Sequence, residues 1–555
     1  MISKEVIFIS DFFINEVMGG AEFCNDALMK LLSPDVKIAS LKSDRVTVQL
    51  VENNLDKFFI VANFFQLAEN VKVALAKTKY VILEHDHKYV RSNNPSLYKD
   101  FLAPEKQIQN KAFYKNALAV LCHSRKHAGV VQRNLLINNI VNLGGNIWNE
   151  EQLATLEGNL HAEKAIKYGI LQSNNRNKGM PAAIAYCQRN GIDFKLIEPK
   201  PFPEFIRDIS QVETLVFFPQ WLETYSRFAI ESRILGCKLI TNSLIGATSE
   251  DYFKLKGKEL LDFIRQNNQN LRQRWIKLID KSEIKYFPPL DLPKITVFCP
   301  LYAGEQYIEG FLKSMQEQTI FDQCELIIVD ANSPENESQY IKEFMKDHKN
   351  VTYRRLDYRA SVMETENMAI HMATGEFFAQ ACVDDRHHRE YLEIMSKHLH
   401  YHEDIDLVYT DCLQTKKPNE TVETNSSSGD YYEHSRNEFS PENMIKCLPG
   451  PMPMWKLSVH EKCGYFDEGL SYAGDWDIFL RMVAAGSKFK KIDIPLGLYY
   501  FNSEGLSTST ENQIPRGKEE AEVFFKHKNV FGEANYNKYK NYFSQFIRNE
   551  NESTT

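Results

Sequence analysis

The amino-acid sequence predicts an α/β protein made of several folding units in series. Short apolar segments of strand length alternate with helical patterns along most of the chain, as they do in parallel α/β sheets. A proline-rich stretch at residues 286–293 interrupts this alternation. A chain of 555 residues is too long for one hydrophobic core, so the segments on either side of the prolines belong to separate domains.

Composition and charge exclude several classes of protein. Hydrophobic residues make up 43% and charged residues 25%, as in soluble globular proteins. The formal net charge is −8 and no long basic run occurs, so we expect no nucleic-acid partner. The ten cysteines are scattered without a CxxC pair, which predicts reduced and mostly buried thiols.

The sequence predicts no transmembrane segment. No stretch reaches the roughly 18 apolar residues of a membrane span, and the apolar run near the first residue is too short for a signal peptide. We therefore expect a cytoplasmic location, with peripheral attachment at the inner membrane face left open.

Two α/β domains are expected before the prolines. The first, residues 1–149, opens with a strand at 6–10 that leads through a glycine pair into a helix, and has further strands at 58–62, 80–83, 117–122 and 137–143. The second, residues 150–285, has strands at 168–172, 194–197, 214–218 and 238–241 and ends in a polar helix at 254–281.

A third α/β domain, residues 294–510, follows the extended linker at 286–293. Its predicted strands lie at 295–299, 324–330, 351–355, 376–381 and 407–410. The polar segment 414–440 is interpreted as a surface loop, with a mobile lid over a substrate as the alternative. Residues 511–555 are expected to form a short helical tail that packs or associates.

Acidic residues end two apolar runs of the third domain. Asp330 closes one run, and Asp384 and Asp385 close another. Ligands of open α/β sheets bind at the carboxyl ends of strands, although an isolated aspartate there often only forms a turn or caps a helix. Paired carboxylates suit a hard divalent cation, Mn²⁺ or Mg²⁺, that bridges phosphate oxygens. The neighbouring His387 and His388 are predicted to face solvent or substrate.

Several motifs follow one another through residues 294–477. They are KITVFCPLY at 294–302, FLKSMQEQT at 311–319, Glu325 to Asp330, Asn367, ATGE at 373–376, Asp384-Asp385, GYFDE at 464–468 and GDWD at 474–477. This ordered set resembles family 2 glycosyltransferases. The resemblance implies a GT-A fold and the transfer of a sugar from a nucleotide-diphosphate sugar to a glycan or lipid-linked glycan acceptor.

The same resemblance implies roles for individual residues. The loop with Pro300 and Tyr302, together with Asp330, would hold the nucleotide base. Asp384 would ligate the metal ion, with Asp385 beside it. Asp475 would be the general base of an inverting displacement and would take the proton of the acceptor hydroxyl.

Three positions depart from the family's pattern. Cys382 stands where the first acid of an Asp-x-Asp triplet is usual, Gly474 where a glutamate usually precedes the base, and Asn502 where a late histidine sometimes helps the metal. These departures predict weaker metal binding or a differently seated donor. They leave a catalytically degenerate carbohydrate-binding scaffold as the alternative function.

Two tryptophans are candidates for the acceptor side. Trp455 follows a proline-rich turn and Trp476 follows the predicted base. Aromatic faces commonly stack on sugar rings, so both are predicted to bind the acceptor. Packing of Trp455 in the core is an equal alternative.

A weaker signal lies in the first two domains. Glu223 and Glu231 are separated by seven residues and lead into a glycine and an apolar strand. This resembles the donor-binding signature of GT-B glycosyltransferases of family 4, and implies Glu223 near the sugar, Glu231 at the ribose and retention of anomeric configuration. Gly20, at a glycine turn that opens a helix, and Lys178 would contact phosphate. A solvated helix face is the alternative for the two glutamates.

The acidic and histidine-rich segment Glu84-His85-Asp86-His87 is ambiguous. His85 would line the cleft between two GT-B-like domains, while a metal-like cluster and an ordinary polar loop are alternatives. The predicted architecture is therefore a GT-B-like pair of Rossmann-like domains, then a GT-A domain and a helical tail. No GxGxxG loop or P-loop supports a dehydrogenase or a kinase.

Overall fold

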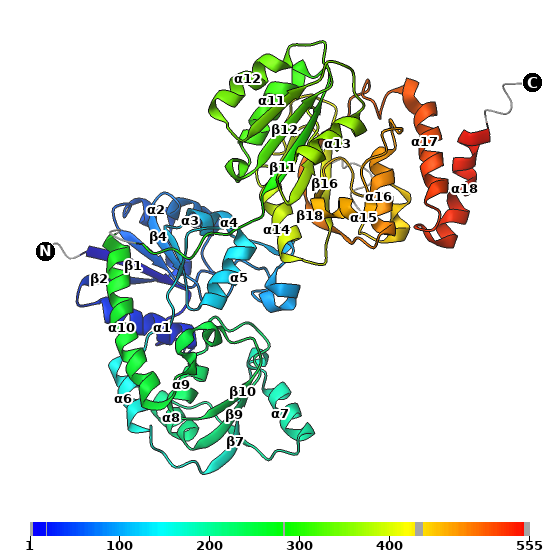
Figure 1. Ribbon diagram of the computed structural model, residues 1–555. Helices are drawn as coiled ribbons and strands as arrows, with labels where there is room; N and C mark the ends of the chain where they lie inside the picture. The colour runs from blue at the N-terminus through cyan, green and yellow to red at the C-terminus, as the bar shows by residue number, and fades with distance from the viewer. Residues whose placement is uncertain (1–3, 18, 281–283, 428–436, 549–555) are drawn as a thin grey trace, which may run out of the picture. The chain divides into compact units, whose positions relative to one another are not determined.

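The computed structural model describes residues 4–17, 19–280, 284–427 and 437–548 (Figure 1). The chain divides into two compact units, Met1–Leu290 and Asp291–Thr555. Strands and helices alternate in both units, so the predicted α/β fold class is confirmed. Residues 428–436 of the predicted polar loop lie outside the described residues.

The first lobe of the first unit is built on a parallel six-stranded sheet of order β2-β1-β3-β4-β5-β6. Every residue of β3 and β5 is buried, because helices cover both faces of the sheet. The strands are β1 (Lys4–Ser10), β2 (Val36–Lys42), β3 (Phe58–Val61), β4 (Lys79–Leu83), β5 (Ala119–Cys122) and β6 (Ile140–Asn142). The helices are α1 (Gly20–Leu32), α2 (Val48–Glu52), α3 (Glu69–Leu75), α4 (Lys111–Asn116) and α5 (Arg125–Leu135).

The second lobe has a parallel four-stranded sheet of order β10-β9-β7-β8. Its strands are β7 (Ile166–Leu171), β8 (Lys195–Ile197), β9 (Val212–Phe217) and β10 (Lys238–Thr241). The accompanying helices are α6 (Glu150–Gly158), α7 (Met180–Arg189), α8 (Phe202–Ser210), α9 (Arg227–Ile234) and α10 (Gly257–Asp280). Both lobes are Rossmann-like, which is compatible with the predicted GT-B-like pair.

Helix α10 belongs to both lobes (Figure 1). Leu260 and Ile264, near its start, are buried in the core of the second lobe. Leu271, Trp275 and Leu278, near its end, are buried in the core of the first lobe against β1 and α1. The last turns of this helix therefore pack with the first lobe, although the sequence assigned them to the second domain. Apolar residues recur at helical spacing along the whole of α10, so the sequence pattern does not show where the helix passes from one core to the other.

The second unit is built on a mixed sheet of order β13-β12-β11-β14-β17-β16-β18-β15. The first four strands of this order are parallel, and β17 is antiparallel to both of its neighbours. The strands are β11 (Ile295–Leu301), β12 (Glu325–Asp330), β13 (Val351–Arg355), β14 (Phe377–Gln380), β15 (Arg386–His387), β16 (Leu407–Thr415), β17 (Met454–Lys456) and β18 (Phe489–Tyr500).

Helices cover this sheet and extend beyond it to the end of the chain. They are α11 (Glu305–Gln316), α12 (Glu337–Asp347), α13 (Val362–Met372), α14 (Tyr391–Tyr401), α15 (His460–Cys463), α16 (Gly474–Ala484), α17 (Gln513–Lys526) and α18 (Gly532–Arg548). The last two pack against each other and against α16 (Figure 1). In the described part of the chain, no helix is long and apolar enough to cross a membrane.

The helical tail is part of the second unit's hydrophobic core. Phe524 of α17 is fully buried and its ring stacks on Phe531 and on Phe543 of α18. The rings of Phe531 and Phe543 in turn pack against Trp476 of α16. Helix α16, which carries the predicted base, is therefore packed against the helical tail.

We expect Phe524→Ala to destabilise the second unit by about 3–5 kcal/mol, because a large ring is removed from a closely packed aromatic cluster. The measurement is the denaturant midpoint of that unit, followed by circular dichroism. Ile514→Ala is the control on the same helix, because Ile514 is 67% exposed and its truncation should change the midpoint little. Equal shifts for the two variants would contradict a buried tail.

Candidate active site

The register of the parallel strands brings the predicted donor-binding residues to one edge of the sheet. Leu301, the last residue of β11, pairs with Asp330 at the end of β12. Asp330 in turn pairs with Arg355 at the end of β13. The segments that follow these three strands therefore lie side by side, as expected for the ligand-binding edge of an open α/β sheet.

Asp330 is fully buried beneath this edge, and hydrogen bonds hold both of its carboxylate oxygens. Oδ1 accepts from the Ser333 amide at 2.7 Å. Oδ2 accepts from the Tyr353 hydroxyl at 2.5 Å and from the Arg355 guanidinium at 3.0 Å. Burial, and then the bond to Asp330, raise the pKa of Tyr353 to about 12, so its hydroxyl stays protonated and donates. Asp330 thus orients two donors that reach the surface of the crevice.

Tyr302 lies in the loop that follows β11, two residues beyond the half-buried Pro300. Its ring is 39% exposed and is covered by the guanidinium of Arg359, 3.0 Å from the ring centroid. An exposed aromatic face next to a cation is suited to stacking on a flat, negatively charged ligand such as a nucleotide.

The loop after β11 is tied to its neighbours by short contacts. The Ala303 amide donates to Ser333 Oγ at 3.0 Å, and the Gly304 amide donates to Glu337 Oε1 at 2.7 Å. A Cβ at Gly304 would lie 3.1 Å from side-chain atoms of Leu301 and Val383, which would have to shift to accept a larger residue. The loop after β11 therefore lies against the acidic segment 382–385 through Val383.

Asp384 and Asp385 follow β14 in that segment. The Tyr500 amide donates to Asp385 Oδ1 at 2.9 Å, which links the acid to the last strand. Burial, and then the charge of Asp384, raise the pKa of Asp385 well above its ordinary value; burial likewise raises the pKa of Asp384. Both carboxylates are thus held where their charges are poorly solvated, and a cation nearby would stabilise them.

The donor set at this point fits a hard divalent cation through its carboxylates. One carboxylate oxygen each from Asp384 and Asp385 and the Cys382 sulfur all lie within 4.8 Å of one another. Burial, and then the charges of Asp385 and Asp384, raise the pKa of the Cys382 thiol well above its ordinary value. A neutral thiol is a poor ligand for a hard cation, so Asp384 and Asp385 would hold it.

Asp475 lies in the first turn of α16, beside a second acid that the sequence analysis missed. Its Oδ1 is buried without a hydrogen-bond partner among the described residues, and burial raises its pKa to about 6. Glu366 of α13 is fully buried, and neither of its oxygens has such a partner. Burial, and then the charge of Asp475, raise the pKa of Glu366 well above its ordinary value. Glu366 directly precedes the motif residue Asn367, the one signal that could have located it.

The two acidic groups belong to one region. The charge of Asp475 is among the causes that raise the pKa of the Cys382 thiol, after burial and the charges of Asp385 and Asp384. Asp475 therefore lies close enough to the segment 382–385 to interact with it electrostatically. Cys382 is thus within electrostatic range of Asp384, Asp385 and Asp475, and Glu366 interacts with Asp475.

The start of α16 is fixed by a carboxylate from the tail. Glu519 of α17 accepts hydrogen bonds from the amides of Ser471, Tyr472 and Ala473 at 2.7–3.1 Å. These three residues lead directly into the turn that carries Asp475. The sequence offered no sign of this, because Glu519 is more than forty positions away in an unremarkable charged helix.

The next acid of this helix is structural. Asp477 is fully buried and interacts with Arg481 at 2.7 Å, Lys526 at 2.8 Å and His527 at 2.8 Å. Although burial acts in the opposite direction, the hydrogen bonds from His527, Lys526 and Arg481 depress its pKa. Asp477 thus joins α16 to α17, whereas Asp475, two residues earlier, has no ion pair within the described part of the chain.

Three predicted surface or acceptor roles are corrected by burial. Trp455 is fully buried, packs against Phe378 and donates from its indole to His460, which favours the core alternative. Trp476 is buried as well and donates to the Met444 carbonyl at 2.8 Å. Neither ring offers a free face to a sugar. His387 is buried against Tyr391 rather than facing solvent or substrate, and burial lowers its pKa to about 3.

The residues predicted in the first unit divide into two groups. Lys178 and Glu223 meet in an ion pair of 2.8 Å, so the structure brings these two together. Gly20 begins α1, as predicted. Glu231 is buried, accepts from the Trp148 indole at 2.9 Å and lies 3.5 Å from Arg227. This internal position excludes the solvated helix face and corrects the predicted ribose contact.

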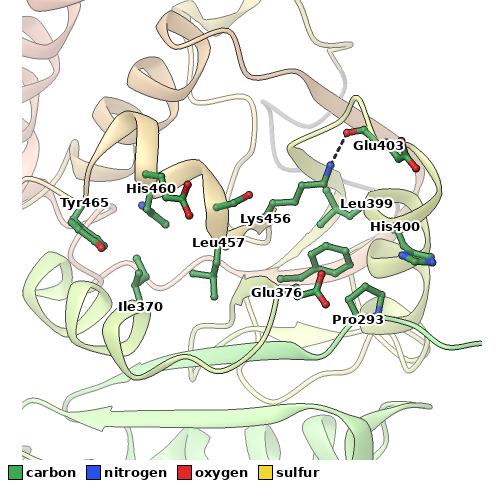
Figure 2. Close-up of a pocket in the computed structure, with 13 residues that line it drawn as sticks. Pro293, Ile370, Glu376, Leu399, His400, Glu403, Lys456, Leu457, His460 and Tyr465 are labelled. Carbon is green, nitrogen blue, oxygen red and sulfur yellow. Dashed lines mark hydrogen bonds between the residues drawn. The ribbon is translucent and has the colours of Figure 1, made fainter.

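A separate hollow of about 610 Å³ lies elsewhere in the second unit (Figure 2). It is lined by Pro293 and Glu376, at the amino ends of β11 and β14, and by Lys456, His460 and Tyr465. None of the residues predicted for the active site lines it. The carboxyl edge of the sheet, where the acids gather, therefore remains the candidate active site.

Acidic side chains at the carboxyl edge of a partly parallel sheet are the arrangement expected of a GT-A glycosyltransferase. Residues 296–460 match the family model for Glycosyl transferase family 2, so the second unit carries a domain of this family. An uncharacterized glycosyltransferase of Methanocaldococcus jannaschii is 23% identical over 205 residues, which are 37% of this chain and 69% of that relative. The predictions of a GT-A domain and of a glycosyltransferase are confirmed.

Two solved structures are similar to part of this chain. TarS of S. aureus, residues 1–349 in complex with UDP, is 17% identical with a TM-score of 0.35, over 43% of this chain and 70% of that one. The mannosyltransferase PcManGT of Pyrobaculum calidifontis, in complex with GDP-Man and Mn²⁺, is 20% identical with a TM-score of 0.34, over 43% and 66% respectively.

We expect Asp475→Asn to stabilise the second unit by about 1–2 kcal/mol at neutral pH; the full pKa shift corresponds to about 3 kcal/mol, and partial exposure reduces it. The folded chain binds this proton more tightly than the unfolded chain, so stability is lost as the pH rises from about 4 through 6. The measurement is the unfolding midpoint of wild type and variant at about pH 7.5 and pH 4.

The stabilisation should become much smaller at the lower pH, where Asp475 is protonated in the folded state and partly protonated in the unfolded state. Asp347→Asn is the control, because Asp347 is exposed at the end of α12 and its substitution should change neither midpoint. A variant that is less stable than wild type at neutral pH would show that Asp475 is not a strained acid.

Proposed function

We propose that the second unit transfers a sugar from a nucleotide-diphosphate sugar to a hydroxyl of a glycan or lipid-linked glycan, with inversion and with Asp475 as the base. The observation that carries this proposal is the group of poorly compensated carboxylates, Asp384, Asp385, Glu366 and Asp475, next to the crevice at Asp330. If these acids had only a structural role, we would expect them to be paired with cationic side chains, as Asp477 is with Arg481 and Lys526.

The nucleotide end of the donor is assigned to the edge formed by Tyr302, Asp330 and Arg355. The Tyr302 ring and the overlying Arg359 provide a surface for a base or ribose, and Asp330 keeps Tyr353 and Arg355 in place as donors. This assignment accounts for a conformation in which the loop after β11 is tied to the segment that follows β12.

A divalent cation held by Asp384 and Asp385 would neutralise charge on the diphosphate leaving group. The low polarity around these carboxylates would make their interaction with a cation stronger than in water. The specific ion is proposed as Mn²⁺ or Mg²⁺, because oxygen ligands suit hard cations.

Asp475 has the properties required of a general base. Its raised pKa makes the carboxylate a better proton acceptor than an ordinary aspartate while leaving it ionised at neutral pH. Burial, and then the charge of Asp475, raise the pKa of Glu366 well above its ordinary value, so Glu366 holds a proton more tightly than an exposed glutamate. We assign Glu366 a positioning role: it occupies the low-polarity space next to the base and can receive a hydrogen bond or donate one.

We also propose a second donor site in the first unit, which would make the enzyme bifunctional with a retaining activity. The ion pair of Lys178 and Glu223 supports this, because it places a cation and a carboxylate together at the second lobe as phosphate and sugar binding would require. The internal position of Glu231 counts against a full donor site.

A carbohydrate-binding scaffold is the competing function. The thiol at Cys382 favours it, because a carboxylate is usual at that position.

We expect Asp475→Asn to lower the turnover of a sugar nucleotide about 10²- to 10⁴-fold, because the acceptor loses its general base. The measurement is the release of nucleoside diphosphate from a panel of uridine and guanosine diphosphate sugars with Mn²⁺. Asp347→Asn is the control and should retain wild-type turnover. A decrease in wild-type turnover as the pH is lowered below about 6 would support Asp475 as the general base. Undiminished turnover in Asp475→Asn would refute this assignment.

We expect Cys382→Asp to lower the Mn²⁺ concentration needed for half-maximal turnover about 10-fold, because a carboxylate replaces a neutral thiol beside the two acids. Asp384→Ala should raise that concentration by a similar factor. Both are read from metal titrations of the turnover assay, with Cys187→Ser as a control at a buried cysteine of the first unit. If neither variant changes the Mn²⁺ concentration needed for half-maximal turnover, the metal does not bind at residues 382–385.

A further inference from the structure

A second cluster of metal-ligating side chains lies in the first lobe, away from the carboxylate site. Cys24 lies on α1, His85 follows β4 and His123 directly follows β5. Their side chains are 2%, 7% and 1% exposed. The thiol sulfur and one nitrogen of each ring all lie within 4.8 Å of one another. Three segments that are far apart in the sequence thus converge on one buried point.

The outer nitrogens of the two histidines are held by oxygen atoms. His85 Nε2 lies 2.9 Å from Asn25 Oδ1, and His123 Nδ1 lies 3.3 Å from the Gly145 carbonyl oxygen. The Asn25 amide nitrogen is directed at Ser10 Oγ, 3.5 Å away, which orients its oxygen toward His85. Carbonyl oxygens only accept hydrogen bonds, so both outer nitrogens carry a hydrogen.

The inner nitrogens of the two rings therefore carry no hydrogen, and their lone pairs point at each other. His85 Nδ1 and His123 Nε2 are 3.1 Å apart. If one of them carried the hydrogen instead, an outer nitrogen would present a lone pair to the Gly145 carbonyl or to Asn25 Oδ1. A positive charge between the rings removes the conflict.

We propose that Cys24, His85 and His123 bind a divalent transition-metal ion, with Zn²⁺ as the ion that best matches the donors. Two imidazole nitrogens and a thiolate are a typical zinc ligand set. Tetrahedral zinc with bonds of about 2.0 Å separates two ligand nitrogens by about 3.3 Å, close to the observed spacing. Oxygen partners on the outer nitrogens are the usual support of metal-bound histidines.

The thiol must lose its proton to act as a ligand. Burial raises the pKa of the Cys24 thiol to about 11, and the charge of the nearby Arg227 acts in the opposite direction. On binding, the sulfur forms a bond to the ion and its proton passes to solvent, with no change of oxidation state. The described cluster supplies three donors, so a water molecule or a small ligand completes the coordination. Binding at this point joins α1 to the ends of β4 and β5.

The test is cobalt substitution in the full-length chain. After removal of metal by a chelator, Co²⁺ is titrated and its absorption spectrum is recorded. We expect about one equivalent to produce a thiolate-to-cobalt charge-transfer band that Zn²⁺ abolishes by displacement. Wild-type protein without this band would overturn the proposal, whatever the behaviour of any variant.

Variants locate the thiolate. Cys24→Ser should remove the band, and His123→Gln should weaken Co²⁺ binding at least 10-fold. Cys382→Ser is the matched control, because Cys382 belongs to the other candidate ligand group, and it should keep the band. Circular dichroism establishes that each variant is folded. A band that is lost with Cys382→Ser and kept with Cys24→Ser would assign the cobalt to the carboxylate site and refute the proposal.

Discussion

The second unit is organised by a group of acidic side chains whose charge is only partly compensated, because burial outweighs the effect of Arg386 on Asp384 and Asp385. Asp384, Asp385, Glu366 and Asp475 are gathered where burial raises all four pKa values. Asp477, only two residues beyond Asp475, is by contrast surrounded by three cationic or potentially cationic side chains. Cations thus surround Asp477, as Arg355 pairs with Asp330, whereas burial dominates at the four acids of the candidate site. Such repulsion would be relieved by a ligand that brings positive charge or donates a proton, which is the behaviour expected of a functional site.

Much of the fold was predictable because strands covered on both faces appear as unbroken apolar runs. β3, β5, β11, β12 and β14 are of this kind. β2 and β18 were missed because polar residues interrupt both segments: β2 lies at the edge of its sheet, and β18 mixes exposed with buried positions. The predicted strand at 137–143 is shorter, as β6, because the ladder with β5 engages only three residues.

The site was predictable to the extent that it follows strand ends. Asp330, Asp384 and Asp385 were found through the apolar runs before them, and Asp475 through its motif. Glu366 lies inside a helix, where no strand end marks it, and its role depends on the approach of α16 in space. The tryptophans show the opposite error. Aromatic type suggests a sugar platform, but only packing decides whether a ring has a free face, and Trp455 and Trp476 have none.

The support of Asp475 lies beyond the segment that the family model recognises. That segment ends at residue 460, whereas the amides leading into α16 are bound by Glu519 and the helix is clamped through Lys526 and His527. A protein engineer who trims this chain to its recognisable portion would keep Asp330, Asp384 and Asp385 and would discard Asp475, the proposed proton acceptor, together with the residues that support it. Chimeras that exchange acceptor preference should accordingly be joined before residue 460 and carry the whole distal segment from one parent.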